Sequence, residues 1–106
     1  MALTRPHEGK GVARDDSEAV RLIGLAANQG NGDAFASLGE LYEKGAGVRQ
    51  DYEEAFIWFE LAASAGVTSE GNERAIANFR ERVPSLMTSA DIAHARRKIE
   101  FRKRAK

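Results

Sequence analysis

The chain has 106 residues, no cysteine, and 16 basic residues balanced by 16 acidic ones. This length suits one domain, and a hydrophobic fraction of 42% with 30% charged residues is typical of a globular protein. No apolar run approaches the ~18 residues of a membrane span, and the lack of cysteine excludes disulfides, a thiol nucleophile and thiolate zinc ligands. The start of the chain lacks the apolar region of about 7–15 residues found in secretory signals, so we expect a cytoplasmic protein.

Charge is unevenly distributed along the chain. Residues 1–70 contain six basic and twelve acidic residues, whereas residues 71–106 contain ten basic and four acidic ones. The neutral total is therefore the sum of an acidic first part and a basic last part.

Five helices are predicted, and most of them begin at a recognisable N-cap. Asp15 and Asp51 each precede a glutamate by three residues, in the pattern of a capping box, and Thr88 stands three residues before an aspartate. Asp33 is the expected cap of the second helix. In chain order, the expected helices cover residues 16–29, 34–44, 52–65, 70–83 and 89–103.

Glycine and proline mark the expected helix ends. Gly30, Gly45 and Gly66 stand where a helix can end in a left-handed residue. Pro84 is expected to stop the fourth helix at the residue before it. The Gly-x-Gly-Val loops at 9–12 and 45–48 follow no strand and precede no Lys-Ser or Lys-Thr pair, so we interpret them as structural turns and not as phosphate-binding loops.

An internal repeat spans residues 9–66. When the chain is shifted by 36 residues against itself, ten of the 22 positions from 9 to 30 match their partners, where chance would give roughly one or two. The matching pairs include Ala19 with Ala55 and Gly30 with Gly66. A period of this length is typical of helical solenoids, in which pairs of helices stack on their neighbours.

The helix over residues 52–65 has two apolar stripes. One stripe contains Tyr52, Ala55, Phe56, Phe59, Ala62 and Ala63, and the other contains Ile57, Trp58 and Leu61. A helix that is apolar nearly all round is covered on more than one side. We therefore expect this helix at the centre of the fold, with Trp58 and Phe59 in the core and not in a stacking platform on the surface.

Several of these residues together resemble the Sel-1-like repeat, a relative of the tetratricopeptide repeat. They are the segment Gly45-Ala-Gly-Val-Arg-Gln-Asp-Tyr-Glu-Glu-Ala55, then Trp58-Phe59 and Ala62-Ala-Ser-Ala-Gly66, with Ala34, Leu38-Gly39 and Tyr42 on the preceding helix. The resemblance covers residues 9–66 well and extends more loosely to about residue 97.

The resemblance implies an all-α fold, a short right-handed solenoid of helix pairs that serves as a non-enzymatic protein-interaction module. We expect a flexible N-terminal segment over residues 1–8, repeats over 9–66, and capping helices with a basic tail over 67–106. In the third helix pair Arg80 stands where the second pair has Gly39, so close contact between the paired helices is expected to be lost there.

Polar residues on the first helix of each pair are the candidate partner-binding site, because the resemblance implies that these helices line a concave face. The acidic bias of the earlier helix favours a basic or N-terminal segment of a partner protein, and the alternative is an ordinary solvated surface. The expected binding residues are Asp33, Ser37, Glu40, Glu43 and Lys44 on the earlier helix and Asn78 and Glu81 on the next, with Ala36 and Ala77 among them.

Residues suited to catalysis or metal binding are few. The only histidines are His7 and His94, and a zinc site usually needs three protein ligands, so no metal and no cofactor is expected. The residue types used in catalytic triads are present at Ser85, Ser89, Asp91 and His94, but no oxyanion loop or nucleophile elbow accompanies them. A cell-wall-related hydrolase is therefore less favoured than either an adaptor or a toxin- or effector-neutralising protein of the immunity type, which some Sel-1-like proteins resemble.

Both ends of the chain carry further predictions. The basic segment over residues 96–106 is expected to continue a docked helix, with Ile92, Ala95 and Ile99 on its buried side, that frays beyond Phe101. These charges could bind nucleic acid, an anionic membrane or the acidic part of the protein itself. Because no DNA-binding motif accompanies them, pairing within or between molecules of this protein, together with simple solvation, is favoured over nucleic-acid binding. The first helix has apolar residues and no complete helix before it to cover them, so we predict a homodimer, or docking on a partner, through the N-terminal end.

Overall fold

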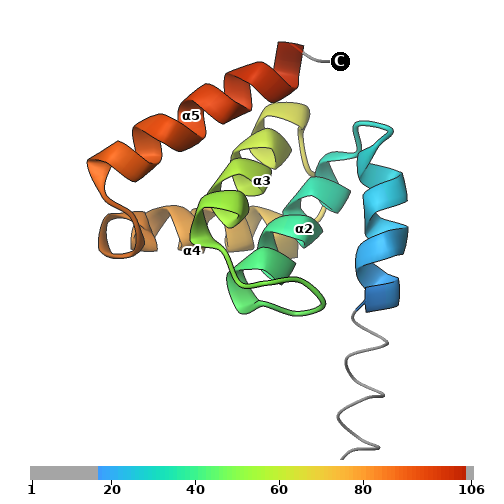
Figure 1. Cartoon of the computed structure of the whole chain (residues 1–106). Helices are drawn as coiled ribbons and strands as arrows, with labels where there is room; N and C mark the ends of the chain where they lie inside the picture. Colours follow the sequence, from blue (N-terminus) through green and yellow to red (C-terminus); the bar gives the residue numbers. More distant parts are fainter. Residues whose placement is uncertain (1–16, 105–106) are drawn as a thin grey trace, which may run out of the picture.

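The structure, a computed structural model, describes residues 17–104. Within this range the backbone forms five helices and no strand, which confirms the predicted all-α fold (Figure 1). The first helix covers residues 17–27 and is followed by α2 (Gly32–Lys44), α3 (Tyr52–Ala65), α4 (Glu70–Leu86) and α5 (Ser89–Arg104). None of the described helices is both long and apolar enough to cross a membrane.

The predicted caps are confirmed at α3 and α5 and wrong at α2. The Asp51 side chain accepts a hydrogen bond from the Glu54 amide at 3.1 Å, and Thr88 and Asp91 exchange two bonds at 3.0 Å each. At α2 the cap is Asn31 and not Asp33, because Asn31 already accepts from the Ala34 amide at 3.0 Å and the helix begins two residues earlier than expected. Asp15 lies outside the described residues.

Helix α4 runs through Pro84 to Leu86, so the expected stop at residue 83 is wrong. Proline removes one donor near the end of the helix, where few hydrogen bonds remain to be broken. The last turn is retained because the Met87 amide donates to the Val83 carbonyl at 2.9 Å and both of these side chains are buried.

Helix α3 is the centre of the core and packs against α2, α4 and α5 (Figure 1). Its residues Ala55, Ile57, Phe59 and Ala62 are fully buried, and the Phe59 ring lies 5.0 Å from that of Phe79 in α4. The prediction that this helix is covered on more than one side is confirmed. Trp58 differs from the expectation, because it is only partly buried at the edge of the core.

The second and third helix pairs pack differently. A Cβ atom on Gly39 would lie 2.9 Å from the Phe59 ring, so this glycine permits the close contact between α2 and α3. In the third pair, α5 diverges from α4 and packs across α3 instead (Figure 1). Arg80, which occupies the position equivalent to Gly39, extends to Glu60 of α3 at 2.8 Å. The expected loss of close pairing at this point is confirmed.

Helices α2 and α4 lie side by side and parallel. Contacts near their N-termini, between Asp33 and Asn72, and near their C-termini, between Glu43 and Arg82, both join residues 39 apart in sequence. Two contacts with the same offset require that the helices run in the same direction. The predicted binding residues therefore belong to two adjacent helices.

Candidate partner-binding surfaces

Four of the predicted binding residues share one side of α2. Asp33, Ser37, Glu40 and Lys44 are spaced by four, three and four residues, which places them on one stripe of a helix. On α4, Asn78 and Glu81 are exposed and stand one turn apart. We use the name α2–α4 face for these six predicted residues, four on α2 and two on the neighbouring α4.

Asp33 is held by the segment that leads into α4. Its carboxylate accepts hydrogen bonds from the Thr68 hydroxyl at 2.6 Å, from the Thr68 and Ser69 amides at 3.1 and 3.4 Å, and from the Asn72 side chain at 2.9 Å. The hydroxyl of Thr68, the Asn72 amide group and these backbone donors lower the pKa of Asp33 from 3.8 to about 2. Asp33 thus joins the second helix pair to the third and has little capacity left for a partner.

The Asp33 bonds predict a pH-dependent stability. Because the pKa of Asp33 is lower in the folded state than in the unfolded chain, its stabilisation is complete above about pH 4 and is lost as the pH falls through about 2. The Asp33→Asn variant should therefore have a lower Tm than the unsubstituted protein at pH 7, and the difference should shrink progressively between about pH 4 and pH 2.

Thermal unfolding followed by circular dichroism at a series of pH values measures this difference. Glu81→Gln is the matched control, since Glu81 is exposed and forms no hydrogen bond with another residue of the 17–104 range. The prediction would be contradicted if the Tm difference between Asp33→Asn and the unsubstituted protein stayed constant from neutral to acidic pH.

Two further predicted residues have structural contacts. The Glu43 carboxylate is paired with the Arg82 guanidinium, and its side chain is half-buried between α2 and α4. Ala36 was expected on the binding surface, and that expectation is wrong because Ala36 is fully buried. Ser37, Glu40 and Lys44 remain accessible on α2, and neither Glu40 nor Glu81 forms an ion pair within the described part of the chain.

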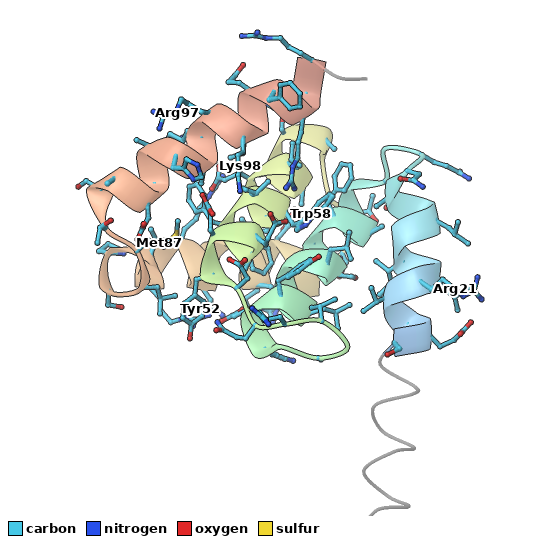
Figure 2. All side chains as sticks on the ribbon, in the orientation of Figure 1. Arg21, Tyr52, Trp58, Met87, Arg97 and Lys98 are labelled. Carbon is cyan, nitrogen blue, oxygen red and sulfur yellow. The ribbon has the colours of Figure 1, made fainter. Side chains whose placement is uncertain are left out.

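The basic residues of α5 are held by acidic residues at the start of α3. Glu53 contacts both the His94 imidazole and, at 3.5 Å, the Lys98 ammonium group, while Glu54 binds the Arg102 guanidinium at 2.9 Å. Lys98 lies on the side of α5 that faces α3, whereas Arg97 points away from it (Figure 2). Of the basic segment over residues 96–106, Lys98 and Arg102 thus pair with the acidic part of the protein, as expected.

Helix α5 continues to Arg104, so the expected fraying beyond Phe101 is wrong. The reason is Arg102, which binds Glu54 and places its guanidinium carbon 5.1 Å from the centroid of the Trp58 ring. Such a cation–π contact, together with an ion pair, holds the last turn of the helix on α3. Ala95 and Ile99 are the buried residues of α5, and Ile92 of the same helix is partly buried, as predicted.

A cleft of about 370 Å³ lies where α3, the end of α5 and the end of the first helix meet. Its walls are mainly apolar, and the residues that matter most for its chemistry are Ala27, Phe35, Trp58, Leu61, Arg102 and Lys103. We call it the Trp58–Arg102 cleft. Sequence reasoning missed it, because Trp58 was assigned to the core and Arg102 to a frayed end.

The residue types of a catalytic triad are not brought together in the described structure. The Ser85 hydroxyl donates to the Arg82 carbonyl in its own helix at 2.9 Å, Asp91 caps α5, and His94 contacts Glu53. Hydrogen bonds with Thr88 and the proximity of His94 lower the pKa of Asp91. No group of three or more His, Cys, Asp or Glu side chains in residues 17–104 is arranged to hold a metal ion, and His7 lies outside that range.

The first helix exposes part of its apolar surface. Ile23 and Ala27 pack on the core, but Leu22 and Leu25 are 52% and 54% exposed. The exposed leucines are compatible with association through this end of the molecule, and the homodimer stays a prediction.

A comparison with protein-family models identifies the repeats. The Sel1 repeat model matches residues 5–31 and 34–67, which together are more than half of the chain. Comparison with curated proteins and with solved structures found no match. The matched segments contain the first helix, α2 from residue 34 onward, and α3, including Gly39 and Phe59 at the contact between the paired helices. The chain therefore belongs to the Sel1 repeat family, whose repeats generally serve as modules of protein–protein interaction.

Proposed function

We propose that this chain is a non-enzymatic adaptor that binds a basic segment of a partner protein on the α2–α4 face. The observation that carries the proposal is a contrast between acidic side chains. Glu43, Glu53, Glu54 and Glu60, which lie between helices, each have a basic partner, whereas Glu40 has none among residues 17–104. A carboxylate without a partner on an accessible helix is available to a cation from another molecule.

The arrangement of the α2–α4 face supports an extended segment as the ligand. Ser37 and Asn78 offer hydrogen-bonding groups on neighbouring parallel helices, and Glu40 and Glu81 offer negative charge on each of them. Lys44, at the C-terminal end of the stripe, has the opposite charge and would favour one direction of the bound segment.

The test is a charge reversal that leaves the intramolecular ion pairs intact. Glu40→Lys with Glu81→Lys is preferable to a change at Glu43, because Glu43 holds Arg82 and contributes to the contact between α2 and α4. The full chain is immobilised and used to capture proteins from a lysate of its source cells, with quantitative mass spectrometry of what is retained. We expect the specifically captured protein to fall by about tenfold or more in the double variant, and capture by the unsubstituted chain to weaken with salt.

The matched control is Glu73→Lys with Glu100→Lys, which changes the charge by the same amount at exposed positions outside the α2–α4 face, and neither glutamate forms an ion pair within residues 17–104. This control should capture the same protein as the unsubstituted chain. Both double variants should retain the helical circular dichroism spectrum, because all four side chains are at the surface. Equal capture by the two double variants would refute binding on the α2–α4 face.

A further inference from the structure

The Trp58–Arg102 cleft has the features of a second binding site, separate from the α2–α4 face. Its volume of about 370 Å³ lies within the range of sites for small ligands or single side chains. Phe35, 5.6 Å from Trp58 between ring centroids, joins Ala27 and Leu61 in an apolar wall formed by three helices. A cleft of this kind buries an apolar group well.

Two hydrogen-bond donors at this cleft have no acceptor within the described protein. They are Nε1 of Trp58 and Nη1 of Arg102, both of which are buried. The Nη2 atom of Arg102 is bound to Glu54 at 2.9 Å, so the guanidinium is oriented with Nη1 left over. Buried donors are nearly always satisfied in proteins, by protein groups or ordered water, and neither nitrogen can act as an acceptor. A ligand that completes the site therefore brings hydrogen-bond acceptors, for which oxygen atoms are the simplest choice.

The charges around the cleft specify the ligand further. Two cations, Arg102 and Lys103, line it, and no acidic side chain of residues 17–104 does. A carboxylate, with two oxygen atoms that accept several hydrogen bonds, complements both this charge and the two donors. The Arg102 guanidinium carbon is only 5.1 Å from the Trp58 ring centroid. A ligand carboxylate at Arg102 and a ligand apolar group against the Trp58 side of the cleft should therefore belong to a single residue.

We propose that the Trp58–Arg102 cleft binds the C-terminal residue of a partner protein, with its α-carboxylate at Arg102 and Trp58 and its apolar side chain against Phe35 and Leu61. Only at the end of a polypeptide are a main-chain carboxylate and an apolar side chain attached to the same Cα atom. The two donor nitrogens are covered by neighbouring atoms, so binding requires a shift of the Arg102 side chain, which is 31% exposed.

The experiment uses the full chain and the fluorescence of Trp58, the only tryptophan in the sequence. The probes are short N-acetylated Gly/Ser peptides that end in leucine or phenylalanine, each prepared with a free C-terminal carboxylate and with a C-terminal amide. When Arg102 moves over the indole ring, the fluorescence emission of Trp58 changes. Isothermal calorimetry gives an independent value of Kd. We expect the free acids to bind at least about tenfold more tightly than the amides, because the amide lacks the charged acceptor.

Variants of α5 test the assignment to Arg102. Arg102→Lys keeps the positive charge beside Glu54 but lacks the planar donor group, and it should weaken binding of the free acids by about tenfold. Arg104→Lys, an exposed change on the same helix outside the cleft, should leave Kd unchanged. The Glu40→Lys with Glu81→Lys variant should also bind the peptides normally, which separates this site from the proposed α2–α4 function.

Several outcomes would overturn the proposal. These are equal affinity for acids and amides, the absence of saturable binding up to about millimolar peptide, or tighter binding of an amidated peptide with an internal glutamate. Equally tight binding of hexanoate or phenylacetate would instead make the cleft a site for small carboxylates. The comparison of acid and amide uses the unsubstituted protein, so it remains decisive even if Arg102→Lys lowers stability.

Discussion

Replacing Phe59 by alanine is expected to lower the free energy of unfolding by about 3–5 kcal/mol. Phe59 is fully buried in α3, touches the Phe79 ring at 5.0 Å between centroids, and packs on the surface that Gly39 leaves open. The substitution removes apolar contacts with two helices at once and leaves a cavity that the surrounding helices cannot fill completely. For a domain of this size the loss is a large part of the total stability.

Urea unfolding followed by circular dichroism measures the effect. Phe101→Ala is the matched control, because Phe101 is 73% exposed and its removal should change the free energy of unfolding by less than about 0.5 kcal/mol. Similar midpoints for the two variants would show that the contact between α3 and α4 is not the stabilising centre of this fold.

Gly32→Ala is expected to destabilise the protein by about 2–3 kcal/mol. A Cβ atom on Gly32 would lie 1.9 Å from the carbonyl oxygen of Gly66, so the start of α2 and the end of α3 would have to move apart. The obstructing atom belongs to the backbone and not to a flexible side chain, which makes relaxation costly. The same movement would affect the nearby contacts of Asp33 with Thr68.

Gly24→Ala is expected to have the opposite effect and to stabilise the protein. Gly24 lies within the first helix, and a Cβ built on it would have no atom of the described residues within 4 Å outside the neighbouring helix backbone. Alanine should therefore stabilise the helix by about 0.5–1 kcal/mol. Thermal and urea unfolding of the two variants gives the sign of each change. A Gly32→Ala variant as stable as the unsubstituted protein, or more stable, would disprove the close approach of Gly32 to Gly66.

The local elements could be predicted closely because they depend on neighbouring residues. The 36-residue repeat and its apolar stripes predicted α3 with its observed bounds, and Gly39 was identified through the resemblance to Sel-1-like repeats. The wrong cap at α2 arose where two local signals compete. Asn31 and Asp33 are both good caps, and only the position of Thr68 explains why Asp33 is used elsewhere.

The candidate sites were predictable only in part. The spacing of Ser37, Glu40 and Lys44 correctly placed them on one accessible side of α2, but the burial of Ala36 and the pairing of Glu43 follow from the position of α4. The Trp58–Arg102 cleft had no sequence signal of its own. Its two central residues are 44 positions apart and belong to different helix pairs.

The sequence by itself determined the helices, their caps at α3 and α5, the repeat and the opposite charges of the two parts of the chain, because propensity, capping and periodicity act over a few residues. The tertiary structure alone decided where those charges meet. In the third pair Arg80 stands in place of a glycine and α5 crosses α3 instead of packing along α4, so that Arg102 reaches both Glu54 and Trp58. Ion pairs and clefts of this kind depend on helix crossings between residues far apart in sequence, and no local pattern encodes them.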